Sequence, residues 1–446
     1  MTADILERKQ MILEGKVVPN LLRLSFPTMM YGAVQAVCPL TDSYFINNYI
    51  GRIAGSAVSY SGTLINMISA AALGIGVAGS AIIGQTNGKG DSRRSEQISL
   101  QMLVLVFIIG VIMMPVLLGL AFIVKTKVGA DIATDVEKYL VYSCAIIPIT
   151  YLEAAYNSIK NACGEPEKPF IRMSFMLVLK LIFNLIFIKQ LKWGIFGAVL
   201  STFISNILIL IWMVYDLFIS PHGSRYSFKG FKNDKNMIAK IIKLGIPSML
   251  NNFILYLGFF LITVQIEKYG TAVLNGQGIA NNIMLICYTV PQAFAMGVTT
   301  MTAMNIGARN EKKAKLSCIA GNVASVITSV ILASIVWLCA EKLAGCFTSD
   351  PEVMKIIIEY LHICTFSVPA FGILMVNMGA FNGLGKTAIA LVIGILRVWV
   401  FRYAFMLITD SILYYRSIFW GDLFSNYICA AITVIIALKI KWESEI

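Results

Sequence analysis

Charged residues are scarce in this chain of 446 amino acids, because only 13% of its residues are Asp, Glu, Lys or Arg while 58% are hydrophobic. A soluble domain carries about 25% charged residues, so the composition excludes a soluble globular protein. Several long stretches contain no charged residue at all, among them 53–88, 97–124, 269–308 and 316–340. A helix that crosses a bilayer needs roughly 20 apolar residues, and each of these stretches is long enough.

Residues for catalysis and metal binding are also few. The chain has two histidines, and its nine cysteines show no CxxC pair or other metal-ligand spacing. HExxH, paired-aspartate protease and Gly-rich phosphate-loop motifs are missing. We therefore expect no catalytic residues, no resident metal and no cofactor, and a membrane-embedded enzyme is the weakest hypothesis.

Two further absences concern the membrane spans. Strands of alternating polarity, which build membrane barrels, are missing, so the spans should be helices. The first 20 residues are polar and mixed in charge and do not resemble a cleavable signal peptide, so we expect the first span to be retained.

What the chain does contain is an internal repeat. Four residues of mixed type recur at a single offset of 221 positions, namely Tyr139, Pro148, Asn161 and Gly164, which return as Tyr360, Pro369, Asn382 and Gly385. Because both halves are strongly apolar, the repeat predicts two similar membrane-embedded lobes. Secondary transporters are commonly built from such repeats, with the substrate site between them.

The apolar segments predict an all-α polytopic membrane protein with twelve transmembrane helices. We place them near 21–46, 54–82, 97–124, 137–160, 169–190, 194–218, 240–264, 272–304, 315–340, 354–380, 387–409 and 417–438. Six helices per half is an even number, so the repeats are parallel. The predicted organisation is an N-terminal lobe over 1–219, a linker over 220–239 and a C-terminal lobe over 240–446.

The net charge of +12 indicates orientation rather than nucleic-acid binding. Basic residues cluster at 89–94, 225–243 and 309–315, which all fall on the side of the membrane that holds both chain ends. Because basic loops stay in the cytoplasm and contact anionic lipid, we expect both termini to be cytoplasmic. The expected partners are the lipid bilayer and a small-molecule substrate.

Ionisable residues at membrane depth are costly and are functional candidates by default. The first lobe offers Asp42, Glu153 and Lys180, which we expect to form one ion or proton-coupling cluster. Asn184 lies four residues after Lys180 on the same helix face, and Thr202 of the sixth span is expected to reach the same pocket. The sequence leaves open whether Lys180 pairs with Asp42 or with Glu153.

Other candidates lie in the first span and in the second lobe. Pro27 removes a backbone hydrogen bond and is a candidate hinge in the first span. Arg402 and Asp422 occupy adjacent spans and form a candidate charge pair, for which a fixed salt bridge is the favoured interpretation. Candidates for lining a substrate cleft are Tyr31, Gln35, Asn251, Tyr256, Gln277 and Gln292.

Several segments together resemble a known family. Leu24-x-x-Pro27 followed by Asp42, Gly51 and Gly88 is similar to the first two spans of multidrug and toxic compound extrusion (MATE) transporters of the bacterial type. The second half resembles that family's second repeat in Gly245-Ile-Pro247, in the stretch 305–313 and in Asn382-Gly-Leu-Gly385. The likeness covers essentially the whole chain.

This resemblance implies two six-helix lobes that form a V and rock between inward-open and outward-open states in a bacterial plasma membrane. It also implies a cation site in the first lobe, to which Asp42, Lys180, Asn184 and Thr202 correspond. The chain departs from the family there, because the resemblance implies an asparagine where Lys180 stands and an aspartate where Asn184 stands. We therefore expect the Lys180 ammonium to occupy the place of a sodium ion.

The resulting hypothesis is a secondary active exporter of amphipathic, cationic organic compounds. A proton gradient, or less favourably a sodium gradient, would drive export by alternating access. The alternative within transport is a flippase for lipid-linked saccharides of the same broad superfamily. The sequence is silent on oligomeric state, and a monomer is the working expectation.

Overall fold

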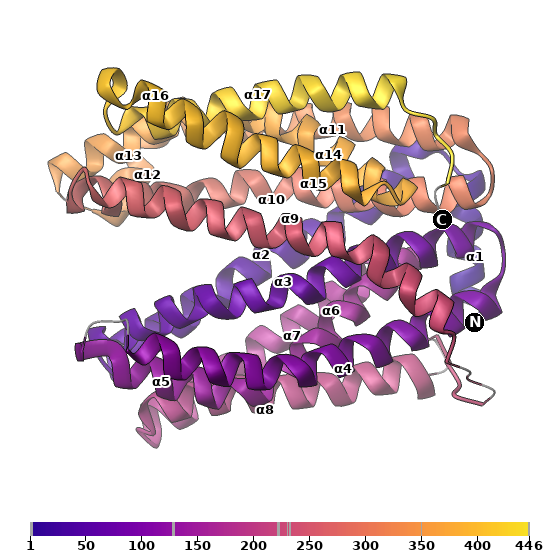
Figure 1. Cartoon of the computed structure of the whole chain (residues 1–446), viewed down its shortest axis with the longest axis horizontal. Helices are drawn as coiled ribbons and strands as arrows, with labels where there is room; N and C mark the ends of the chain where they lie inside the picture. Colours follow the sequence, from indigo (N-terminus) through magenta and orange to yellow (C-terminus); the bar gives the residue numbers. More distant parts are fainter. Residues whose placement is uncertain are drawn as a thin grey trace. The chain divides into compact units, whose positions relative to one another are not determined.

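The chain is helical along almost its entire length. The computed structural model describes residues 3–126, 130–220, 224–229, 231, 233–348 and 350–444, and these residues form helices without any strand (Figure 1). Ten helices among these residues are long and apolar enough to cross a membrane. The other two predicted spans, 21–46 and 137–160, correspond to one helix over Val17–Tyr49 and one helical stretch over 130–162. The predicted all-α membrane fold is confirmed.

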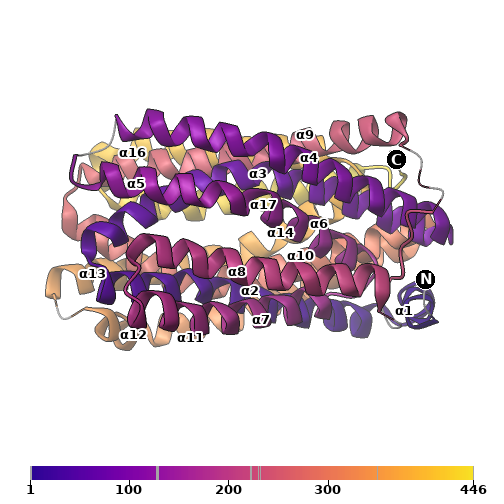
Figure 2. The same cartoon turned by 90° about the horizontal axis from the view of Figure 1, so that it is seen from below.

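The first half of the chain contributes eight α-helices, interrupted by short segments of other helical geometry. The α-helices are α1 (Ala3–Glu14), α2 (Val17–Tyr49), α3 (Arg52–Gly88), α4 (Ser92–Lys125), α5 (Ala130–Ser143), α6 (Ile147–Ala162), α7 (Glu167–Asn184) and α8 (Gly194–Val214). Between or after them lie the 3₁₀ turn η1 (Cys144–Ile146) and the π-helices η2 (Leu185–Gln190) and η3 (Tyr215–Ile219). Within this half, α7 and α8 run side by side (Figure 2).

The second half contributes nine α-helices and one π-helix. The α-helices are α9 (Lys235–Glu267), α10 (Thr271–Gly307), α11 (Glu311–Leu338), α12 (Ala340–Phe347), α13 (Pro351–Cys364), α14 (Ser367–Leu384), α15 (Thr387–Ile395), α16 (Ala404–Leu413) and α17 (Arg416–Lys439). The π-helix η4 (Leu396–Tyr403) joins α15 to α16. π-Helical turns are rare and are frequent at functional sites. η2 ends the fifth span of the first repeat, and η4 lies within the fifth span of the second.

Internal contacts divide the chain into two compact units. Unit 1 consists of Met1–Glu14 with Met30–Met249, and unit 2 consists of Gly15–Met29 with Leu250–Ile446. The division therefore cuts α2 and α9 two residues after Pro27 and Pro247, respectively. Pro27 lies inside α2 and is half-buried. The two repeat-related prolines thus mark the points at which these long helices pass from one unit to the other.

The repeat is visible in how the helices begin and end. Asp91 caps α4 by accepting a hydrogen bond from the backbone of Arg94, and Asn310 caps α11 in the same way through Lys313. Both caps follow a glycine-containing turn, and Asp and Asn are preferred at this position because their side-chain oxygens satisfy free backbone N–H groups. Chain duplication has preserved the local chemistry of the turn as well as its position.

Small residues allow the helices of unit 2 to approach closely. A Cβ atom added at Gly379 of α14 would lie 2.4 Å from the carbonyl oxygen of Ala295 on α10, so only glycine fits there. Thr299 of α10 donates a hydrogen bond to the carbonyl of Gly379 at 2.9 Å. Close backbone approach of this kind holds helices together in lipid, where apolar burial gives little net attraction between them.

The predicted linker is partly attached to unit 1. Tyr226 donates its backbone N–H to the carbonyl of Leu217 at 2.8 Å and its hydroxyl to Ser99 at 3.3 Å. The backbone N–H of Ser227 donates to Glu96 at 2.7 Å. Burial raises the pKa of Tyr226 well above its ordinary value, so the phenol stays protonated. Pro221, His222 and Gly223 of the predicted linker lie outside the described residues.

Candidate functional site

The structure joins two of the predicted intramembrane residues of unit 1 in an ion pair. Lys180 of α7 places its Nζ 2.5 Å from Oδ2 of Asp42 on α2. The lysine side chain is 8% exposed and the aspartate side chain 23% exposed, so the pair is mostly enclosed but retains access on the carboxylate side. The sequence left two partners open for Lys180, and the structure selects Asp42.

Amide and hydroxyl groups complete the surroundings of the carboxylate. Asn184, one helical turn after Lys180, donates its Nδ2 to Oδ1 of Asp42 at 3.1 Å. Ser201 of α8 donates to Oδ1 of Asn184 at 2.6 Å and so fixes the orientation of that amide. Thr202 instead donates to the carbonyl of Ala198 in its own helix. Adjacent helical residues point about 100° apart, and it is Ser201 rather than the predicted Thr202 that faces the pair.

An apolar cluster closes the site towards the end of α2. Phe45 and Ile46 of α2 pack there with Ile188 of η2 and Ile195 of α8. Tyr139 and Leu181 pack against the same cluster. Leu181 directly follows Lys180 in α7, and Ile46 lies one helical turn after Asp42 in α2, so the ion pair lies beside this apolar cluster.

Glu153 does not join the Asp42–Lys180 pair. Its carboxylate lies 2.9 Å from Nη1 of Arg172 on α7, and the two side chains are 12% and 2% exposed. Arg172 Nε also donates to Asn157 at 3.1 Å, and Asn157 donates to the Tyr31 hydroxyl at 3.2 Å. Arg172 was not singled out from the sequence, although it lies inside the predicted fifth span, 169–190. Its position there was the available signal.

A second buried network, at the turn between α6 and α7, was not predicted. The fully buried ammonium of Lys160 lies 2.7 Å from Asp216 and 3.2 Å from Glu165. Lys168 reaches the same Asp216 at 3.0 Å, and the Tyr156 hydroxyl donates to it at 2.9 Å. These residues lie at the ends of predicted spans, where charges are ordinarily solvated. The network fixes the end of α6 to η3 rather than forming a binding site.

In unit 2, the predicted pair of Arg402 and Asp422 is present and deeply buried. Arg402 of η4 lies 2.7 Å from Oδ1 of Asp422 on α17, with side-chain exposures of 8% and 4%. Oδ2 of Asp422 accepts hydrogen bonds from Ser367 at 2.9 Å, Asn426 at 3.1 Å and Tyr288 at 3.2 Å. Four donors from four different side chains thus surround this carboxylate, which is the arrangement expected of a fixed salt bridge.

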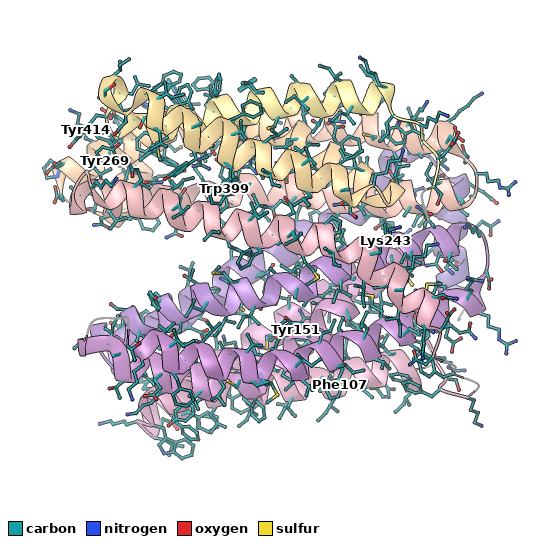
Figure 3. All side chains as sticks on the ribbon, in the orientation of Figure 1. Phe107, Tyr151, Lys243, Tyr269, Trp399 and Tyr414 are labelled. Carbon is teal, nitrogen blue, oxygen red and sulfur yellow. The ribbon has the colours of Figure 1, made fainter. Side chains whose placement is uncertain are left out.

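The predicted cleft residues lie in different environments within their own units. Gln35 and Gln292 are exposed, Tyr31, Asn251 and Tyr256 are half-buried, and Gln277 is buried. Among the described residues, the amide oxygens of Asn251 and Gln277 are buried without a hydrogen-bond partner. Figure 3 marks Trp399 of η4, whose indole N–H donates to the carbonyl of Ile254 on α9 at 3.3 Å and so connects these two helices of unit 2.

A family model matches the chain twice. The MatE model covers residues 27–186 and again residues 247–408, which are the two halves of the internal repeat. The chain belongs to the MatE family. It is therefore an integral membrane transporter and not an enzyme. The starting points of the two matches, Pro27 and Pro247, are the repeat-related prolines of α2 and α9.

Individual known proteins are similar to this chain over most of its length. The probable multidrug resistance protein YpnP of Bacillus subtilis is 27% identical, with 94% of each chain covered. A FAD transporter of Shewanella oneidensis is 22% identical, with 86% of each chain covered. A crystal structure of a MATE transporter in complex with MaL6 has a TM-score of 0.91 at 21% identity, with 98% of each chain covered. At that identity, the structural likeness establishes the shared fold.

Proposed function

We propose that this MatE transporter is a secondary active exporter of amphipathic, cationic organic compounds, driven by a proton gradient through alternating exposure of its substrate site. Family membership and the name of YpnP support the substrate class. The observation that carries the coupling proposal is the ion pair of Lys180 and Asp42 at 2.5 Å inside a membrane span.

The contacts of Asp42 favour a proton over a sodium ion as the coupling ion. Sodium needs several oxygen ligands and a net negative site. Here one oxygen of Asp42 already faces the Lys180 ammonium, and the other accepts from the Asn184 amide nitrogen, which is a donor and not a ligand. A sodium ion beside the ammonium would experience direct charge repulsion.

The pair can carry a proton in two ways that change its net charge by one unit. Protonation of Asp42 leaves the Lys180 ammonium unbalanced, and loss of a proton from Lys180 leaves the Asp42 carboxylate unbalanced. An unbalanced charge strongly favours a hydrated environment over a dry one. Gain or loss of the proton therefore shifts the balance between the closed apolar cluster at Phe45 and Ile46 and a state in which water reaches the pair.

The proposal is tested with purified protein in proteoliposomes. We expect a cationic dye to accumulate when only a pH gradient is imposed, and to move no faster than in empty liposomes when only a sodium gradient is imposed. Transport that follows sodium and ignores pH would refute proton coupling. If neither gradient drives transport of the dye, and the protein translocates a lipid-linked saccharide, the flippase alternative holds instead.

We further propose that both termini are cytoplasmic and that the protein lies in a bacterial plasma membrane. Cys346 of α12 provides a native test, since it is exposed and would lie on the outer surface. A membrane-impermeant maleimide should label intact cells that express the protein, and the Cys346→Ser variant should remain unlabelled. Labelling of Cys346 only after the membrane is permeabilised would place the termini outside.

A further inference from the structure

Unit 2 buries two guanidinium groups near a single carboxylate. Arg402 and Asp422 form the ion pair described above, and Asp422 has further donors in Ser367, Asn426 and Tyr288. This carboxylate carries a single negative charge, and Arg402 already offsets it, so the three charged groups together carry a net charge of +1. Any other cation in this interior must be balanced by something else.

That other cation is Arg397, five residues earlier in η4. It is 8% exposed and lies between α14 and α17, with its guanidinium 4.9 Å from the centre of the Phe371 ring. Its Nε donates to the side-chain oxygen of Asn426 at 2.9 Å. Asn426 is neutral and is itself bonded to Asp422, so it orients Arg397 without balancing its charge.

Within the part of the chain that the structure describes, no carboxylate lies at ion-pair distance from Arg397, and its two terminal nitrogens have no protein acceptor. An unbalanced charge buried in an apolar interior is costly. Arginine does not relieve that cost by losing its proton. The remaining way to offset it is an anion from outside the chain, and the planar fork of a guanidinium matches the two oxygens of a carboxylate or phosphate.

We propose that Arg397 is the anion-binding group of a substrate subsite within unit 2. The subsite takes a carboxylate or phosphate group attached to an aromatic or otherwise apolar body, with Phe371 beside it. This substrate class rests on the proposed export of amphipathic compounds. With the subsite, the substrates include zwitterionic amphiphiles as well as simple cations. In unit 1, by contrast, the described pairs of Asp42 with Lys180 and of Glu153 with Arg172 are each balanced.

The experiment measures equilibrium binding of two matched dyes to the full-length protein in nanodiscs. One is a cationic rhodamine ester, and the other is its free acid, in which a carboxylate replaces the ester. We expect Arg397→Gln to weaken binding of the free acid by roughly tenfold or more, the value of a lost charge-assisted hydrogen bond, and to leave binding of the ester unchanged. Arg397→Lys keeps the charge and should restore part of the difference.

Benzoate and phenylphosphonate, added as competitors, identify which anion the subsite prefers. The proposal is overturned if wild-type protein does not bind the free acid, if neither competitor displaces it, or if Arg397→Gln weakens both dyes equally. Export of both dyes under a pH gradient is measured separately. If the free acid binds through Arg397 but a pH gradient drives export of neither dye, the anion subsite stands and the proposed function fails.

Discussion

Replacing Lys180 by arginine is expected to abolish proton-driven export while leaving the protein folded. Arginine keeps a cation beside Asp42, so the buried carboxylate remains paired, but a guanidinium does not release its proton inside a protein. If Lys180 gives up its proton during the cycle, the initial rate of dye export under a pH gradient should fall on the order of a hundredfold. Asp42→Asn, which removes the pair's anion, should reduce export to a similar extent.

The matched control is Thr202→Val. Thr202 belongs to the same region, but its hydroxyl is bonded to its own helix and not to the pair, so this variant should export at a rate close to that of the wild type. All variants are compared in proteoliposomes after their melting curves have been shown to match. An arginine variant that exports normally would exclude a titrating lysine and leave Asp42 as the only proton carrier of the pair.

Arg402→Gln is expected to produce a large loss of stability. It leaves the carboxylate of Asp422 in a site where that side chain is only 4% exposed, with no cation at ion-pair distance among the described residues. Breaking a buried ion pair from one side costs roughly 3–5 kcal/mol, because the remaining charge stays buried and unbalanced. The free energy of unfolding, measured by titration with a denaturing detergent, should fall by about that amount.

Arg397→Gln is the matched comparison in the same π-helix. It removes a buried charge that no described carboxylate balances, so its free energy of unfolding should equal or exceed that of the wild type. The double variant Arg402→Gln with Asp422→Asn should recover much of the stability lost in Arg402→Gln, because it removes both charges. Equal destabilisation by Arg397→Gln and Arg402→Gln would show that the two guanidinium groups share Asp422.

The architecture was largely predictable because the bilayer imposes it. Apolar stretches of the required length must become helices in lipid, where every backbone group has to be satisfied within its own segment. The offset of 221 residues between Tyr139 and Tyr360 then indicated two similar lobes, and the two family matches fall on the same halves. Both signals are carried by the order of residues and do not depend on side-chain contacts.

The partners of the buried charges were predictable only in part. Asp42, Lys180 and Asn184 were expected together and lie together. Arg172 was missed as the partner of Glu153, since a basic residue near a span end looks like a loop residue until the helix is known to be packed on that face. Thr202 was expected in the pocket from the resemblance, but Ser201 faces it instead. A shift of one residue rotates a side chain by about 100°, and the sequence alone does not fix the rotation of a helix to that precision.

The amino-acid order by itself determined that this protein is a duplicated, helical, membrane-embedded transporter with few charges in its interior, because hydrophobic length and repetition are linear properties of a chain. Only the tertiary structure decided which charges balance one another. Lys180 pairs with Asp42, and Glu153 pairs with Arg172. Arg397 instead donates a hydrogen bond to the amide oxygen of Asn426. Such pairings depend on the rotation of each helix about its own axis and on π-helical turns such as η2 and η4, which are set by packing between segments distant in sequence.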